Sequence, residues 1–321
     1  MSIDSSDGIT NSLIAKLDLS DLSAVVMPAA AEELLAATRE CGFIYVHIGS
    51  EHASTIRNMR RAQHAFFAQS IARKSEISID VNNRGYLAEG LAQMHGAAKC
   101  DQKEVFFWGR EADSNDPDVI AGLPLCGANQ WPELAGFQNA VFSYSAMIQS
   151  IGDKLLQIVA VSLGAPSSFF NAYYERCMLR GQLLCYPPTE NHPDRFGVAP
   201  HSDFGCITLL LQETAGLEVL FPNGEWIPAP PAENTLVVNI GDLLERWSND
   251  HFPSTKHRVR NLSADARYSI AMFYDPDPGA VIDSTDLLPD ETAKYPPVTA
   301  AEYILGRNKG AFQHYKKDAL V

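Results

Sequence analysis

The chain between Leu179 and Tyr274 carries six short β-prone runs. They are LRGQLLCY (179–186), CITLLLQ (206–212), LEVLF (217–221), TLVVNI (235–240), HRVRN (257–261) and RYSIAMFY (267–274). The runs are rich in apolar, aromatic and β-branched residues, and clusters of Pro, Gly, Asn and Asp separate them. Strands so short and so closely spaced are typical of an all-β sandwich or barrel.

The chain before Tyr174 has a different character. Residues 31–43 (AEELLAATRECGF) predict a helix stopped at Gly42, where a left-handed conformation is available, and residues 42–48 (GFIYVHI) then predict a strand. Longer helices are predicted over about 51–70 and 132–164, and a helical tail near 300–305. We therefore expect a mainly β fold with flanking helices, built as one compact unit.

Composition excludes several kinds of partner. The 321 residues are 46% hydrophobic and carry a formal charge of −14, so nucleic acid and anionic membranes would be repelled on average. No apolar run reaches the roughly 20 residues needed to cross a bilayer. The six cysteines include no CxxC pair, and the N-terminus lacks a basic region followed by an apolar run. These features predict a soluble protein of the cytoplasm, which we expect to be a monomer.

Three residues form a candidate metal site. His201 and Asp203 are two residues apart at the entry to a predicted strand, so an extended backbone sends both side chains to one face. His257 lies on another predicted strand, 54 positions after Asp203. Two imidazoles and one carboxylate on one face of an octahedron leave three positions open, as in non-haem Fe(II) oxygenases. An isolated His-x-Asp pair would more often belong to the surface.

A second pair of residues predicts a carboxylate receptor. Arg267 and Ser269 are two apart on a predicted strand and begin ten positions after His257. A guanidinium presents a planar fork that matches a carboxylate, and a neighbouring hydroxyl can donate to the same group. Taken alone, an Arg-x-Ser pair would more often be a surface arginine paired with an acid such as Asp265.

The combination resembles a known family. His201-x-Asp203, His257 and Arg267-x-Ser269, with NIGDLLERWSNDHFPSTKHRV (239–259) between them, resemble the isopenicillin-N-synthase-like family of Fe(II)- and 2-oxoglutarate-dependent oxygenases. The segments ECGFIYVHI, NRGYLAEG and DQKEVFFWG extend the likeness, which covers about residues 15 to 275. It implies a double-stranded β-helix, or jelly roll, that binds Fe(II), 2-oxoglutarate and O2.

The resemblance also implies site residues and regions. His201, Asp203 and His257 would bind iron, whereas Arg267, Ser269 and Tyr186 would bind 2-oxoglutarate. The family often has Asn-x-Tyr where this chain has Leu184-Cys185-Tyr186, so Leu184 receives no role. The implied regions are an N-terminal non-haem dioxygenase-type region (12–120), a helical support (121–174), the oxygenase jelly-roll core (175–280) and a C-terminal helical tail (281–321).

The implied activity is oxidation of a C–H bond of a small molecule, by hydroxylation or desaturation, with release of succinate and CO2. An oxidative cyclase of the isopenicillin N synthase type, which needs no 2-oxoglutarate, stays open, as do an ascorbate-dependent oxidase, a zinc hydrolase and a metal-binding module without turnover. The pattern does not identify the substrate or a role for the 187–200 loop. Expected pocket walls are Tyr86, Leu183, Ile207, Phe273 and the tail after Tyr303, and Trp247 and Phe252 are expected to pack beneath His257.

Overall fold

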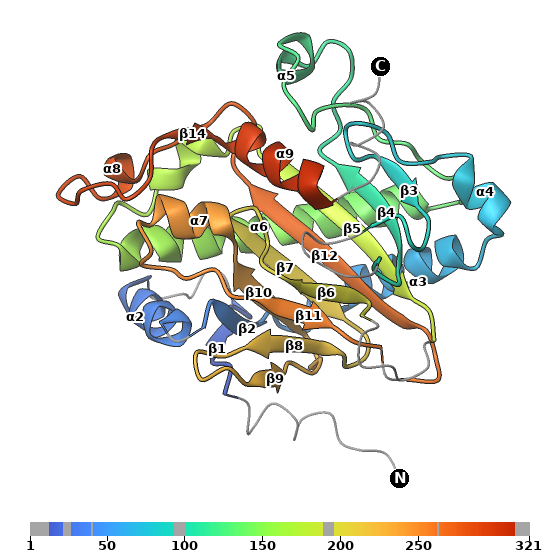
Figure 1. Cartoon of the computed structure of the whole chain (residues 1–321), viewed down its shortest axis with the longest axis horizontal. Coiled ribbons are helices and arrows are strands. Elements are labelled where there is room, and N and C mark those ends of the chain that lie inside the picture. Colours follow the sequence, from blue (N-terminus) through green and yellow to red (C-terminus); the bar gives the residue numbers. More distant parts are fainter. Residues whose placement is uncertain are drawn as a thin grey trace.

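Two facing sheets form the centre of the molecule (Figure 1). The computed structural model describes residues 13–21, 27–39, 41–92, 100–188, 196–261 and 263–311, with the backbone alone at 310 and 311. The larger sheet contains, in spatial order, β1 (Lys16–Asp18), β2 (Phe43–His47), β10 (Thr235–Ile240), β7 (Ile207–Gln212), β12 (Arg267–Asp275), β5 (Met178–Tyr186), β4 (Glu104–Gly109) and β3 (Gly85–Leu87). The smaller sheet contains β6 (Val198–His201), β11 (His257–Val259), β8 (Leu217–Leu220) and β9 (Trp226–Pro228). A separate pair joins β13 (Val281–Ile282) and β14 (Val298–Thr299).

The larger sheet is buried on both faces. Because side chains alternate along a strand, one set faces the smaller sheet and the other faces the helices. Val105 and Leu184 of the larger sheet pack with Val198 and Val259 of the smaller one. Their neighbours Phe106 and Leu183 belong instead to the core beneath the helices. The two facing, largely antiparallel sheets confirm the predicted mainly β architecture with flanking helices.

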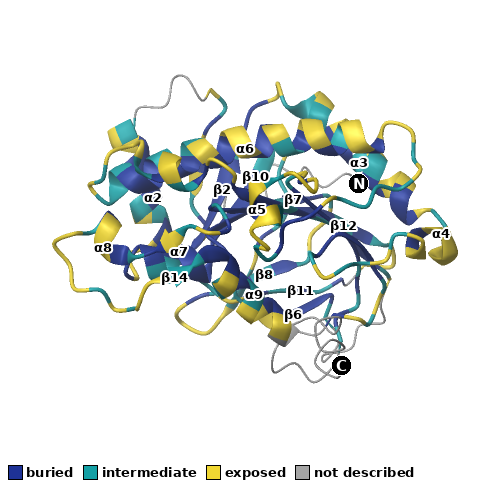
Figure 2. Ribbon diagram, turned by 90° about the horizontal axis from the view of Figure 1, so that it is seen from above, coloured by how far each residue is buried: buried dark blue, intermediate teal, exposed yellow. Residues whose placement is uncertain are grey.

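A helical layer covers the outer face of the larger sheet. Figure 2 shows the buried strands between this layer, which includes α2 (Met27–Thr38), α3 (Ala53–Phe67) and α6 (Phe137–Ser162), and the strands β6, β8 and β11. The other helices are α4 (Ile71–Ser75), α5 (Pro117–Ile120), the 3₁₀ helix η1 (Phe169–Tyr173), α7 (Asp242–Trp247), α8 (Ser284–Leu287) and α9 (Ala300–Ala311). Among the described helices, none has the length and apolarity that crossing a bilayer requires.

The prediction that Gly42 stops the preceding helix in a left-handed conformation is wrong. Helix α2 ends at Thr38, and Gly42 does not adopt a positive φ. A Cβ atom at Gly42 would lie 2.0 Å from the carbonyl oxygen of Pro253. Glycine is therefore needed here because the backbone of the segment before β11 passes very close to the start of β2.

Candidate metal centre and carboxylate receptor

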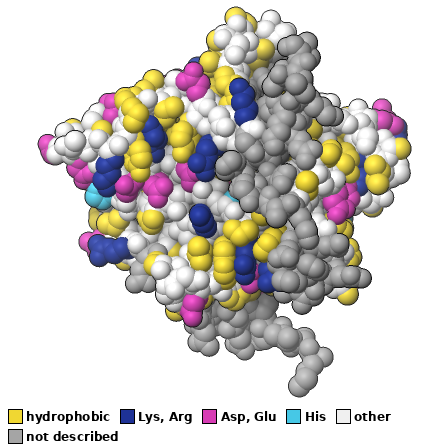
Figure 3. Space-filling model, in the orientation of Figure 1, with side chains coloured by type: hydrophobic (Ala, Val, Ile, Leu, Met, Phe, Trp, Pro, Cys, Tyr) yellow, Lys and Arg dark blue, Asp and Glu magenta, His cyan; other side chains and the backbone are white. Residues whose placement is uncertain are grey.

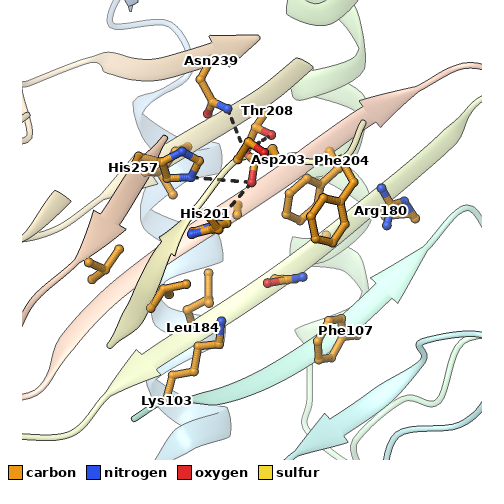
Figure 4. Close-up of a pocket in the computed structure, with 18 of the residues that line it drawn as sticks. Lys103, Phe107, Arg180, Leu184, His201, Asp203, Phe204, Thr208, Asn239 and His257 are labelled. Atoms are coloured by element: carbon orange, nitrogen blue, oxygen red, sulfur yellow. Dashed lines mark hydrogen bonds and ion pairs between the residues drawn. The ribbon is translucent and has the colours of Figure 1, made fainter. Parts of the chain in front are cut away.

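The smaller sheet brings the three predicted metal ligands together. His201 ends β6 and His257 begins β11, and the two residues are directly paired in the antiparallel ladder. Asp203 follows two residues after His201, and its Oδ1 lies 3.6 Å from Nε2 of each histidine. Figure 4 shows the three side chains converging on one point. Among the described residues, they are the group of three or more His, Cys, Asp and Glu side chains whose ligand atoms all lie within 4.8 Å.

Backbone carbonyls orient both imidazoles. Nδ1 of His201 lies 2.8 Å from the carbonyl oxygen of Ala199, and Nδ1 of His257 lies 3.2 Å from that of Thr255. A carbonyl only accepts, so each Nδ1 must carry the hydrogen, and a neutral ring then has its lone pair on Nε2. Burial, and next the neighbouring His257, lower the pKa of His201, which favours the neutral ring. Both Nε2 atoms are thus prepared to bind a cation.

The carboxylate of Asp203 is fixed by one of its oxygens. Thr208 Oγ1 and Asn239 Nδ2 donate to Oδ2 at 2.6 and 2.7 Å. Burial alone would raise the pKa of Asp203, but the two imidazoles and these hydrogen bonds outweigh it and lower the pKa. The aspartate is therefore ionised, and its other oxygen, Oδ1, faces the two histidines.

These features fit a divalent metal. Ligand atoms about 2.1 Å from a shared cation lie between roughly 3.0 and 4.2 Å apart, depending on the angle between the bonds. The separations of 3.6 Å from Asp203 Oδ1 to both Nε2 atoms fall in this range. Two nitrogens and one carboxylate oxygen are the donor set of a facial triad.

Arg267 is a buried cation without an acidic partner among the described residues. It is 1% exposed, and its guanidinium donates to the carbonyl of Ala215 (3.1 Å), to Gln212 Oε1 (2.7 Å) and to Ser269 Oγ (3.4 Å). Its guanidinium carbon lies 4.8 Å from the centre of the Tyr186 ring. Burial lowers the pKa of Arg267, and the contact with Tyr186 opposes this. The structure thus brings Arg267, Ser269 and Tyr186 together around one positive charge.

The ladder register separates two levels in the barrel. Asn239, Thr208, Phe273 and Arg180 are successive ladder partners on β10, β7, β12 and β5, and we call them the outer row. Arg267 and Tyr186 are paired on the same two strands, β12 and β5, and we call them the deep row. On β5 the two rows are six positions apart, from Arg180 to Tyr186, or about 20 Å along the strand. The outer row includes the residues that fix Asp203, so the triad lies near this level.

The triad lines one pocket, and residues of both the outer row and the deep row also line it. The lining contains Phe273, as predicted, and also Tyr186 and Leu184. The predictions for Tyr86, Leu183 and Ile207 are wrong, because these side chains lie on the helix-facing side of the larger sheet. Each is one position away from a residue that faces the barrel.

The surroundings of His257 also differ from the prediction. The ring of Phe43 packs edge-on against it, with ring centres 5.2 Å apart. Trp247 packs against Phe170 and Tyr173 of η1, in the core beneath the larger sheet, and Phe252 belongs to that core. The sequence contains the aromatic residue at Phe43 but no local signal that relates it to a histidine over 200 positions later.

Three polar residues of the site escaped the sequence interpretation. Thr208 and Asn239 hold Asp203, and Gln212 holds Arg267. Each is a polar residue in an otherwise apolar run, CITLLLQ or TLVVNI. A buried polar side chain needs a partner, so this interruption of the pattern is the signal that could have found them.

Two predicted regions are only partly described. Residues 189–195 of the 187–200 loop and residues 312–321 of the tail lie outside the described residues. Within the described part of the tail, Asn308 of α9 lines the pocket.

Two family models match the chain. The 2OG-Fe(II) oxygenase superfamily matches residues 167–276, and the N-terminal region of a non-haem dioxygenase in morphine synthesis matches residues 14–134. A 2-oxoglutarate-Fe(II) type oxidoreductase of Emericella nidulans is 34% identical over 272 residues, which cover 79% of this chain and 77% of the relative. The chain belongs to the 2OG-Fe(II) oxygenase superfamily. The resemblance stated from its motifs is confirmed.

Solved structures of the superfamily share the fold. A 2OG-Fe(II) oxygenase family protein of Caulobacter crescentus has a TM-score of 0.82 and 30% identity, over 93% of this chain and 99% of that one. A full-length Neurospora crassa protein in complex with α-ketoglutarate and thymine has a TM-score of 0.79 and 26% identity, over 96% and 97% of the two chains. These neighbours confirm the double-stranded β-helix.

The protein is therefore an oxygenase that uses Fe(II), 2-oxoglutarate and O2 to oxidise a C–H bond, with release of succinate and CO2. A second relative, a 2-oxoglutarate-dependent dioxygenase of Talaromyces stipitatus, is 32% identical over 83% of this chain and 87% of its own length. The names of these relatives and the α-ketoglutarate bound to the Neurospora crassa protein disfavour an oxidative cyclase that works without 2-oxoglutarate.

Proposed function

We propose that this oxygenase holds Fe(II) with His201, Asp203 and His257 and receives the distal carboxylate of 2-oxoglutarate at Arg267, Ser269 and Tyr186. The observation that carries the proposal is the presence of two complementary sites in one barrel. Three ligand atoms converge at one level, and a buried guanidinium without an acidic partner in the described chain lies deeper. A co-substrate that bridges them must have a carboxylate at one end and metal-binding oxygens at the other, as 2-oxoglutarate has.

The chain's own groups would prepare and position the reactants. Bound iron together with 2-oxoglutarate supplies the activation of O2. Thr208 and Asn239 keep Asp203 turned toward the two histidines, and the backbone carbonyls keep both Nε2 atoms unprotonated. Arg267 anchors the co-substrate in one direction. The apolar lining, which includes Leu210, Val198 and Val259, keeps bulk water from the reacting atoms.

A zinc hydrolase or a metal-binding module explains less of this site. Three protein ligands and a water would suffice for zinc, but neither alternative needs an arginine that is buried without an acidic partner among the described residues. Gln212, Ser269 and the Tyr186 ring all support that arginine, which supports a site for a second, anionic reactant.

Other parts of the proposal concern partners and place of action. We propose a small-molecule substrate and no nucleic acid or membrane partner. On the face in Figure 3, Lys and Arg side chains lie among acids over α7 and α9, and Arg307 and Lys294 pair with Asp242 and Asp250. The described side chains on that face thus form no extended cationic surface. A monomeric state, a cytoplasmic location and the four-region division at 12–120, 121–174, 175–280 and 281–321 stay predictions.

The deciding experiment is anaerobic addition of Fe(II) and then 2-oxoglutarate to metal-free protein. A keto acid that binds Fe(II) through two oxygens gives a weak visible charge-transfer band, which we expect here. His257→Ala should lose iron binding and the band together. Arg176→Gln is the matched control, because Arg176 pairs with Asp118 away from the pocket. Iron binding without the band, at saturating 2-oxoglutarate, would contradict the co-substrate assignment.

A further inference from the structure

The outer row ends in an arginine that the iron and 2-oxoglutarate sites do not use. Arg180 lies on β5, on the same strand face as Tyr186 but about 20 Å from it. Across the sheet it is two strands from Thr208, so their Cα atoms are about 10 Å apart. Arg180 is thus near the level of the triad and far from the carboxylate receptor.

Figure 4 shows how these groups lie around the triad. Arg180 and Phe107 are on one side of it and Lys103 is on another, with Phe204 between Asp203 and Arg180. A molecule in contact with Arg180 can therefore place a carbon atom beside the metal without entering the deep row.

Hydrogen-bonding groups in this part of the pocket lack partners. Arg180 directs Nε and Nη2 to Asp275 Oδ2, at 3.2 and 2.6 Å, and its Nη1 has no acceptor within the described chain. The amide of Gln182, two residues further along β5, also makes no hydrogen bond to described residues. Asn308 is 3% exposed, and its Nδ2 is buried without a partner among them. All three residues line the pocket, so an oxygen acceptor of a ligand would satisfy them.

The charged side chains that line the pocket are mostly positive, whereas the whole chain has a negative net charge. The charged lining residues are Arg84, Lys103 and Arg180 against Asp203 alone, in a chain with a formal charge of −14. Asp101 compensates Lys103 and Asp275 compensates Arg180. Within the described part of the chain, the guanidinium of Arg84, a residue 2% exposed, donates only to backbone carbonyls, and the nearby carboxylate of Asp80 accepts from the Arg84 backbone N–H without forming an ion pair with the guanidinium. With three cationic side chains against one carboxylate in the lining, an anionic ligand near Arg180 would be favoured over a neutral one.

Aromatic rings form the walls beside these donors. Phe107, Phe204 and Phe273 line the pocket, and the guanidinium of Arg180 lies over the Phe273 ring at 5.3 Å. Aromatic walls favour a ligand with a conjugated or aromatic face, because stacked and edge-on ring contacts add to the gain from burial.

We propose that the substrate is a small, flat, conjugated or aromatic carboxylic acid, whose carboxylate binds Arg180 with help from Gln182 and Asn308. The inference rests on the proposed function, since it assigns the triad and the deep row to iron and 2-oxoglutarate. Two carboxylates then occupy the barrel together, the co-substrate's at Arg267 and the substrate's at Arg180. A neutral lactam of the same shape would satisfy the donors but would add no negative charge to the net positive lining.

The test uses pairs of compounds that differ only in charge. Cinnamate, 2-naphthoate and indole-3-carboxylate are each added beside the corresponding primary amide to the anaerobic protein with Fe(II) and saturating 2-oxoglutarate. Binding is followed by the shift of the charge-transfer band and, independently, by saturation-transfer NMR of the compound. We expect at least one acid to shift the band and to bind at least 10-fold more tightly than its amide.

Variants test whether the preference for acids over amides depends on Arg180 and its neighbour Gln182. Arg180→Gln with Asp275→Asn removes the charge without leaving a buried carboxylate unpaired, and should weaken the acid about 10- to 100-fold while leaving the amide within about threefold. Gln182→Leu removes a side chain that makes no hydrogen bond to described residues. If the double variant unfolds, the preference for the acid over its amide is measured in this single variant instead. Arg176→Gln is the control arginine outside the pocket and should change neither affinity.

The outcomes separate the two proposals. Absence of the band before any compound is added contradicts the proposed function. A normal band that no acid shifts, that amides shift equally, or that acids abolish by displacing 2-oxoglutarate overturns the substrate proposal and leaves the oxygenase assignment standing. An acid preference that survives both the double variant and Gln182→Leu overturns the proposed role of Arg180 and Gln182 in binding the carboxylate.

Discussion

Arg267 lies directly opposite Tyr186 in the β12–β5 ladder, with its guanidinium carbon 4.8 Å from the centre of the tyrosine ring. The ring covers one face of the guanidinium, and Gln212 and Ala215 accept hydrogen bonds on its edge. The arginine is consequently fixed before any ligand arrives. A preorganised side chain loses little freedom on binding, which would strengthen the proposed binding of a carboxylate.

Replacement of Arg267 should therefore weaken 2-oxoglutarate and spare iron. For Arg267→Leu we expect the apparent requirement for 2-oxoglutarate to rise about 10- to 100-fold, as loss of a charged hydrogen-bond partner implies. Titration of the charge-transfer band with 2-oxoglutarate measures the change, and the iron content of the same samples is the control. A rise of less than about threefold would contradict the assigned role.

The two donors to Asp203 should control metal affinity. Thr208→Val and Asn239→Leu each remove a hydrogen bond to Oδ2, so the carboxylate loses its fixed orientation. We expect each variant to bind Fe(II) about 10- to 100-fold more weakly, as is typical when a supporting partner of a ligand is lost. Anaerobic Fe(II) titration checks this. Thr208→Ser keeps the hydroxyl and should bind iron nearly as the parent does; equal losses in Ser and Val variants would point to packing instead.

Gly152 of α6 should resist substitution although alanine favours helices. A Cβ atom there would lie 2.4 Å from Cδ1 of Tyr274, whose ring is fully buried between helix and sheet. We expect Gly152→Ala to lower the free energy of unfolding by about 1–3 kcal/mol, because the crowded ring must move. Denaturant unfolding measures this, with Ser150→Ala, at an exposed position on the same helix, as the control expected to stay within about 0.5 kcal/mol. An unchanged stability of Gly152→Ala would show that α6 can move away from the sheet.

Four cysteine thiols should be unreactive in the folded protein. Burial raises the pKa of Cys126 and Cys185 to about 11 and that of Cys177 to about 12, and raises the pKa of Cys206 well above its usual value. A raised thiol pKa means that the reactive thiolate is scarce below it and forms only as the pH approaches it. At pH 8 we expect a thiol reagent to leave these four unmodified by mass spectrometry, until denaturant is added. Rapid modification of any of them in native protein would show local opening.

Much of the candidate site was predictable because its paired residues lie only two positions apart in the sequence. Arg267-x-Ser269 places two groups on one face of β12, and this alternation holds wherever the strand lies. His201 and Asp203 are close for a simpler reason, since Asp203 follows the last residue of β6 by only two positions. The supporting residues were harder, because Thr208 and Asn239 acquire their meaning only when β7 and β10 pair beside the triad.

The prediction of the pocket-wall residues failed for a related reason. The larger sheet is apolar on both faces, since one packs on helices and the other on the smaller sheet. In LRGQLLCY, Leu183 and Leu184 look alike, and nothing local says which of them faces the barrel. An alternating polar pattern would have decided it, but a strand buried on both sides does not have one.

The six-residue separation of the outer and deep rows has a practical meaning for anyone redesigning this enzyme. Positions 180 and 182 on β5 can be varied while position 186 and its partner at 267 stay untouched. A library restricted to positions 180 and 182 would, under the proposed roles, explore new substrates while the groups at 186 and 267 that would bind 2-oxoglutarate stay in place. Each end of this one strand can then be optimised in its own round of selection, and gains made at one end need not be lost at the other.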